Sequence, residues 1–286
     1  MTPVTWDYCY LIFHLLKEFE CWQAGKNVML RIGFVACCKL TIKIMEEIVS
    51  RDIILSQVDE SCSNLCSEIE AQIPLTFNRH DVKEYWSQPH KSPSGNITSA
   101  DIWYYEPLKS SKLAHELLHI KCSLVLRDGV CMQGYNSKSQ LASALLSDKM
   151  VTGIINFTEH IIFYKEYKAL GYDIDDMFES TLDSNRPHLE RLMREGIKIG
   201  NLYMPPKVVE FVMLSMQYAL YPDVNRFREE ISILNNIDPT LYGIFNRYQS
   251  DVKKIKMLAS NDAKLQKLYC RLRDDIVHWC ERNAKF

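Results

Sequence analysis

Residues that interrupt helices are scarce in this chain. Its 286 residues include only ten glycines and ten prolines, about 3.5% each, where average usage is roughly 7% and 5%. The stretch in which they gather is 74–107. Long helices are therefore expected elsewhere. We predict a mainly α protein of the α+β class, with a small sheet in that stretch and helical segments on both sides.

The pattern of apolar residues divides the chain into three stretches. We predict a helical N-terminal segment over 1–73, a mixed core over 74–175 and a helical C-terminal segment over 176–286, all of which can form one compact domain. Ile97–Tyr105, rich in Ile, Thr, Trp and Tyr, predicts a strand. Breaks are expected at 185–187 and 204–206, and helices over Ser111–Val125, Ser139–Leu170 (ended by Gly171), Val208–Leu220, Val224–Leu234 and Pro239–Cys280.

Charge and hydropathy exclude two classes of partner. Thirty-four basic and thirty-six acidic residues give a formal net charge of −2, which leaves no positive excess to neutralise many phosphates. Nucleic acid is therefore not an expected partner. No window of eighteen uninterrupted apolar residues occurs, so a membrane span is not expected either. The oligomeric state is left open by the sequence.

Cysteines and the N-terminus indicate the compartment. Ten cysteines in a long chain are sparser than in small disulfide scaffolds, so reduced thiols are expected. Cys62 and Cys66 form a lone C-x3-C that fits one face of a helix at least as well as half a zinc site. The first residues have no early basic charge and no small-residue cleavage site. We therefore expect a cytoplasmic protein.

Residues 115–119, His-Glu-Leu-Leu-His, form the motif that carries chemistry. His115 and His119 are four residues apart, so both imidazoles lie on one helical face and can reach one zinc ion. Glu116 then lies beside the open position of the metal, where a carboxylate can act as general base. The surrounding helix is apolar nearly all round, and its polar residues need partners when buried. The alternative is a chance match in which the polar residues form a satisfied structural cluster.

A third metal ligand is expected near residue 160. No Glu or His occurs from Ile120 through Thr158, and then Glu159 and His160 arrive together on an apolar helix. Glu159 is the first choice for the third ligand and His160 a close second. The residue that is not a ligand, or Asn156, is expected to orient a ligand through a hydrogen bond. Alternatively, both residues lie on a solvated face. A polar stripe of the same helix points to the site and consists of Asp148, Thr152, Asn156 and Glu159 or His160.

The motif helix followed by an acidic or histidine ligand resembles the zincin metallopeptidases, and in particular the compact intracellular ones. Positions 122 and 125 are Cys and Val, where the metzincin branch has Gly and His. The resemblance implies a zincin-like core with Zn²⁺ as cofactor. It also implies that the strand before the motif helix, Ile97–Tyr105, lies along the active-site cleft and pairs with an extended peptide.

Two functions from different classes follow. The first is a zinc-dependent endopeptidase that hydrolyses an intracellular protein or peptide substrate, with water activated by Glu116. The second is a non-catalytic helical interaction protein with a structural or vestigial zinc site. A zinc hydrolase that acts on other electrophiles is a weaker third option. Tyr164, Tyr167 and Tyr172 are open candidates for stabilising an oxyanion.

Overall fold

The structure is a computed structural model of the whole chain. It describes residues 47–126, 130–132, 134, 139–220 and 226–283, and within these ranges it describes the backbone alone at 130, 178–184 and 219–220. The helices expected before residue 47 lie outside the described residues. The described chain is mainly helical with a small sheet, as predicted.

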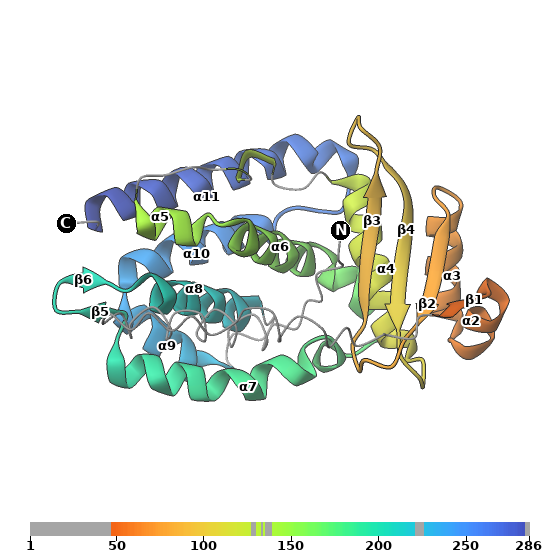
Figure 1. Ribbon diagram of the computed structural model, residues 1–286, viewed down its shortest axis with the longest axis horizontal. Coiled ribbons are helices and arrows are strands. Elements are labelled where there is room, and N and C mark those ends of the chain that lie inside the picture. The colour runs from red at the N-terminus through yellow and green to blue at the C-terminus, as the bar shows by residue number, and fades with distance from the viewer. Residues whose placement is uncertain (1–46, 127–129, 133, 135–138, 221–225, 284–286) are drawn as a thin grey trace, which may run out of the picture.

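A four-stranded sheet lies at one end of the molecule (Figure 1). Its strands are β1 (Glu47–Val49), β2 (Leu75–Arg79), β3 (Trp86–Lys91) and β4 (Ile97–Tyr104), in the spatial order β1-β2-β4-β3. Strands β2 and β4 are parallel, whereas β3 is antiparallel to β4. The strand predicted over Ile97–Tyr105 is confirmed as β4. Strand β3 was not predicted.

The position of β4 corrects one expectation. Strand β4 is hydrogen-bonded to β2 on one side and β3 on the other, so it has no free edge for an added peptide. Within the described residues, the two edge strands of the sheet are β1 and β3, and β3 is the one next to β4. The Ala100 N–H donates to the Pro74 carbonyl on the β2 side, so Pro89, opposite Ala100, turns its backbone away from β4. A proline without an N–H is tolerated at such an edge.

The remaining described chain is helical, apart from a two-stranded hairpin of β5 (Lys198–Ile199) and β6 (Leu202–Tyr203). The helices are α2 (Arg51–Gln57), α3 (Glu60–Glu70), α4 (Ser110–Val125), η1 (Val130–Met132), α5 (Gln140–Leu145), α6 (Asp148–Ala169), α7 (Ile174–Glu195), α8 (Pro205–Leu220), α9 (Arg228–Ile237), α10 (Pro239–Val252), η2 (Ala259–Asn261) and α11 (Asp262–Asn283). The motif helix predicted over Ser111–Val125 is confirmed as α4.

Three predicted helix boundaries are wrong. The single helix expected over Ser139–Leu170 is divided into α5 and α6, because the Ser147 side chain accepts the Met150 N–H and begins a new helix. The helix expected over Pro239–Cys280 is likewise divided into α10 and α11. The break expected at 185–187 does not occur. Helix α7 continues through Pro187 to Glu195.

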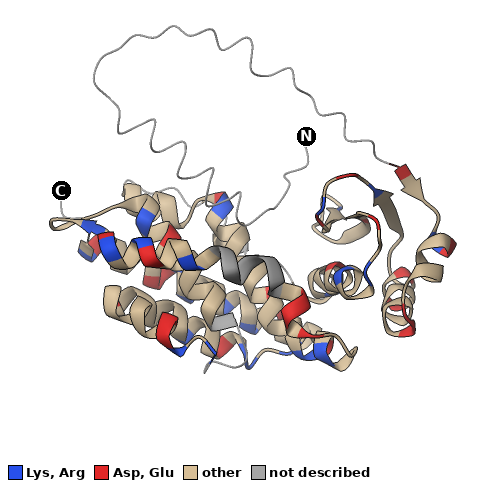
Figure 2. Ribbon diagram, turned by 90° about the horizontal axis from the view of Figure 1, so that it is seen from below, with Lys and Arg blue, Asp and Glu red and all other residues tan. Residues whose placement is uncertain are grey.

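Helix α4 lies between the sheet and the other helices (Figure 1). It packs against α3, β3 and β4 on one side and against α6 and α7 on the other. One hydrophobic cluster contains side chains from all three predicted stretches, from Ile54 to Cys280. Acidic and basic residues are interspersed along the helices (Figure 2). Among the described helices, none has the length and apolar character that a membrane span requires.

Candidate metal centre

Helix α4 places two histidines on one face. His115 and His119 are one turn apart, and their Nε2 atoms are 2.9 Å from each other. The apolar residues on either side of them are fully buried, among them Ala114, Leu117 and Leu118. Because these neighbours are packed into the core, the two imidazoles are held in position at the surface of α4 that meets α6.

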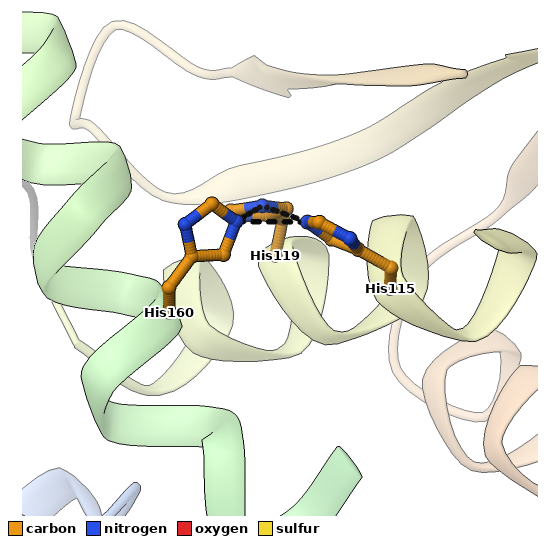
Figure 3. Close-up of side chains that lie close together, drawn as sticks. All are labelled: His115, His119 and His160. Atoms are coloured by element: carbon orange, nitrogen blue, oxygen red, sulfur yellow. Dashed lines mark hydrogen bonds between the residues drawn. The ribbon is translucent and has the colours of Figure 1, made fainter. Parts of the chain in front are cut away.

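Helix α6 brings a third histidine to the same point. The His160 Nε2 lies 2.8 Å from His115 Nε2 and 3.1 Å from His119 Nε2. Figure 3 shows the three rings pointing toward one another, two from α4 and one from α6. The ring of Phe163, one turn after His160, packs edge-on against all three imidazoles. The histidine group is therefore held by two helices and an aromatic wall.

Three converging Nε2 atoms do not form a satisfied hydrogen-bond network. An imidazole nitrogen has one in-plane site, which carries either a proton or a lone pair. At most one N–H can point into the triangle, so at least two lone pairs face each other at hydrogen-bond distance. A cation at the centre removes this repulsion. The three nitrogens are a donor set that suits zinc and other borderline transition metals. The group can hold a metal ion.

Glu159 lies behind the histidine group. Its Oε2 is 2.7 Å from His119 Nδ1, so the Nδ1–H donates to the carboxylate and Nε2 is left with its lone pair toward the centre. The Ser123 hydroxyl donates to the other oxygen, Oε1, over 3.3 Å. His160 is thus the residue whose nitrogen joins the group that can hold a metal ion, whereas Glu159 contacts the far side of the His119 ring.

The polar stripe expected on α6 reaches the site only at its C-terminal end. Asp148 and Thr152 are exposed on the first turns of the helix, and Asn156 is half-buried. The C-x3-C pair of α3, Cys62 and Cys66, is fully buried in the core and is not part of the histidine group.

Glu116 lies between α4 and the edge strand β3. Its Oε2 accepts a hydrogen bond of 2.9 Å from the Ser87 hydroxyl, and the side chain is almost completely buried. Burial raises the pKa of the Glu116 carboxyl, while the nearby His119 and the hydrogen bond from Ser87 oppose this shift. Ser87 had no sequence signal, since β3 was not predicted as a strand.

Burial has different effects on the three histidines. It is the main cause that lowers the pKa of His115 and of His160 well below the usual value, and the neighbouring imidazoles lower it further. Burial also acts on His119, but the hydrogen bond and charge of Glu159 outweigh it and raise the pKa of this ring. His115 and His160 therefore favour the neutral form, which is the form that binds a metal.

The three tyrosines considered as residues that could stabilise an oxyanion lie at different places relative to the histidine group. Tyr167 is fully buried, and its ring lies 6.4 Å from that of His115. Tyr172 donates to Asp59 at the start of α3. Tyr164 is half-buried on α6. Of the three, Tyr167 is thus the one whose ring contacts the histidine group.

Fold and site define a mainly helical α+β protein with a three-histidine group that can hold a metal ion. No family model matches the chain, and neither a curated protein nor a solved structure matches it.

Proposed function

We propose that this protein is a zinc-dependent endopeptidase. His115, His119 and His160 would hold the zinc ion, and Glu116 would serve as the general base. One observation carries the proposal: three imidazole nitrogens from α4 and α6 converge within 3.1 Å, and a buried carboxylate follows directly after the first of these histidines.

The composition of the group favours a catalytic over a structural site. Structural zinc sites are usually closed by four protein ligands, whereas catalytic sites have three and leave a position for water. Within the ranges that the structure describes, the His, Cys, Asp and Glu side chains offer three such ligands at this point. His115 and His119 are each partly exposed, which leaves a path for solvent and substrate.

The residues of the site have separate tasks in hydrolysis. Zinc, when bound, acidifies a coordinated water and polarises the substrate carbonyl. Glu116 takes the proton from the attacking water and later delivers it to the leaving amine. Ser87 holds the Glu116 carboxylate through its hydroxyl. Glu159 keeps His119 in the tautomer whose Nε2 lone pair faces the centre.

The edge of β3 is the surface that suits an extended peptide. Ser87 belongs to β3 and contacts Glu116, so this edge passes directly beside the proposed base. Like Pro89, two residues further on, Ser87 turns its backbone N–H and carbonyl away from β4. These groups can pair with the main chain of a substrate by strand addition. Pairing with an extended peptide substrate, which was first expected of Ile97–Tyr105, is therefore proposed for β3.

The substrate class that fits is an unfolded or extended segment of a protein. We propose a cytoplasmic location, since reduced thiols favour it. The six described cysteines are all free.

A comparison of wild type with Glu116→Gln tests the function. Both proteins are loaded with zinc and incubated with a cytoplasmic protein extract, and newly formed N-termini are mapped by mass spectrometry. We expect new N-termini with the wild type and a loss of at least about 100-fold in Glu116→Gln, which is the usual size of a general-base effect. Glu229→Gln, an exposed carboxylate of α9, is the matched control and should cleave like wild type.

Two outcomes would contradict the proposal. Equal cleavage by wild type and Glu116→Gln would show that Glu116 is not the base. Zinc binding at full stoichiometry without any new N-termini would support the alternative, a helical interaction protein with a structural zinc site.

A further inference from the structure

Two cysteine side chains lie where η1 packs against α11. Cys131 lies on η1, which follows the motif helix, and Cys270 lies on α11. The packing of η1 against α11 brings the two side chains close to each other. Their positions in the sequence are 139 residues apart, so this contact is a product of the fold and not of local chain geometry.

Cys131 is fixed against α11 by two further contacts. Its thiol lies 3.8 Å from the Gln266 carbonyl, and its own carbonyl accepts a hydrogen bond of 3.0 Å from Arg273 Nη1. Gln266, Cys270 and Arg273 follow one another at helical spacing and so share one face of α11. Because Cys131 contacts all three, its sulfur is held beside that of Cys270.

The pair differs from the other described cysteines in exposure. Cys131 and Cys270 are both partly exposed, so a small oxidant in solution can reach them. The remaining described cysteines are buried: Cys62, Cys66, Cys122 and Cys280. Buried thiols of this kind are inert. The structure therefore contains one accessible dithiol within the described residues.

We propose that Cys131 and Cys270 form a reversible disulfide when the protein meets a peroxide. In the first step, one sulfur attacks the peroxide, the O–O bond breaks, and a sulfenic acid and water are produced. In the second step, the other thiol attacks the sulfenic sulfur, the S–S bond forms and a second water leaves. Two thiols and one hydrogen peroxide thus give one disulfide and two waters, and two electrons pass to the peroxide.

Cys270 is the sulfur that reacts first. Burial is the main cause that raises the pKa of the Cys131 thiol to about 12, and the contact with Cys270 adds to it. The Cys131 S–H also donates to the Gln266 carbonyl over 3.8 Å, which favours the thiol form. A thiol is a poor nucleophile toward peroxide. Cys131 then acts as the resolving residue, which attacks the sulfenic acid of Cys270.

The disulfide would fasten the segment after the motif helix to the C-terminal helix. Helix α4 ends at Val125 and η1 begins at Val130, so the cross-link lies close in sequence to the helix that carries His115 and His119. A cross-link that closes a long stretch of chain removes much conformational entropy from the unfolded state. The oxidised form is thus expected to be the more stable one, with the histidine group unchanged.

The test treats the full-length protein with a slight excess of hydrogen peroxide and identifies cross-linked peptides by mass spectrometry without reduction. We expect a Cys131–Cys270 peptide that disappears with dithiothreitol, together with a higher melting temperature of the oxidised protein. In Cys131→Ser, Cys270 should instead be captured by dimedone as a sulfenic acid. Cys280→Ser, a buried control, should form the cross-link like wild type.

The proposal is overturned if peroxide yields no Cys131–Cys270 peptide, or if either sulfur pairs mainly with another cysteine. It is also overturned if dimedone labels Cys131 in Cys270→Ser as fast as it labels Cys270 in Cys131→Ser, since the assigned order of reaction would then be wrong. These outcomes do not depend on peptidase activity, so the disulfide and the proposed function can fail separately.

Discussion

At the scale of single residues, the rotation of α6 decides which of two adjacent side chains joins the histidine group. Glu159 and His160 differ by about 100° around the helix. The burial of Phe163 and Tyr167 against the histidines sets that rotation. As a result His160 joins the nitrogen group, while Glu159 reaches the far side of the His119 ring.

Replacing Glu159 tests this division of tasks. Glu159→Gln is expected to lower zinc affinity about 10- to 100-fold, the usual effect of losing a carboxylate that orients a ligand histidine. His160→Ala should lower it much further, because it removes a ligand. Affinity is measured by competition with a chromophoric chelator. Glu166→Gln is the control and should bind like wild type; Glu166 also lies on α6, and its carboxylate pairs with Lys121 of α4.

If Glu159→Gln lost zinc as completely as His160→Ala, then Glu159 would be a direct ligand. The sequence could not decide between the two residues, since spacing alone places both near the motif. It did predict that the His115 and His119 side chains lie together, because a four-residue spacing on a helix fixes their mutual position whatever the rest of the fold. Ser87 and Ser123 contact the site only through tertiary packing, so nothing in their local sequence marks them.

At the scale of elements, the start of α3 depends on a carboxylate. Asp59 accepts a 2.9 Å hydrogen bond from the Cys62 N–H and a 2.7 Å one from the Tyr172 hydroxyl. Partial burial would raise the pKa of Asp59, but the hydrogen bonds from Cys62, Tyr172 and Ser110 outweigh it and lower the pKa below its ordinary 3.8. The charged carboxylate is thus the form that stabilises the folded state.

Asp59→Ala should reduce the free energy of unfolding at pH 7 by about 1 kcal/mol, as expected for loss of a helix N-cap. Because the pKa of Asp59 is lower in the folded than in the unfolded protein, its carboxylate stabilises the folded state at pH values above the unfolded-state pKa. This stabilisation is lost as the pH falls through the folded-state pKa. The difference from wild type should therefore shrink below pH 3.8. Urea unfolding at several pH values measures it, with the exposed Asp52→Ala as control. A difference independent of pH would contradict the assignment.

The proposed pairing of substrate with the edge of β3 is tested by two replacements of Ser87. The N–H of Ser87 points away from β4, so Ser87→Pro removes a donor for substrate pairing without removing a bond of the sheet. Ser87→Ala removes only the hydroxyl that holds Glu116. We expect Ser87→Pro to cleave substrate at least about tenfold more slowly than Ser87→Ala, as loss of about 1.4 kcal/mol of transition-state binding would give. Equal rates in the two variants would exclude strand addition at this position.

Sequence patterns predicted elements unevenly, and the reasons are physical. Strand β4 and helix α4 were predicted because their residues have strong intrinsic preferences and buried faces. Strand β3 was missed because it contains Pro89, which is acceptable only at a sheet edge. The break before α6 was missed because one capping serine, Ser147, ends a continuous apolar pattern. A break was predicted at Pro187, where α7 continues.

At the scale of the whole molecule, the histidine group joins two regions of the fold. Helix α4 belongs to the layer that covers the sheet, whereas α6 belongs to the helices on its other side (Figure 1). A metal held by both helices binds the folded state and not the unfolded chain. At a free zinc concentration of 100 times the Kd it stabilises the fold by about 2.7 kcal/mol.

For a chain of this size, that stabilisation corresponds to a melting temperature about 5–10 °C higher with zinc than with a chelator. Differential scanning fluorimetry measures the shift. His160→Ala should lose most of it, while His90→Ala, whose ring pairs with Asp101 on the sheet, should retain it. An equal shift in wild type and His160→Ala would mean that zinc stabilises the protein through another site.

X-ray absorption at the zinc edge of the wild-type protein with one equivalent of zinc measures which atoms bind the metal. We expect three imidazole nitrogens and one non-protein oxygen at about 2.0–2.1 Å, with the imidazole count falling to two in His160→Ala. Sulfur ligands at about 2.3 Å, or no zinc retained at one equivalent, would contradict this expectation.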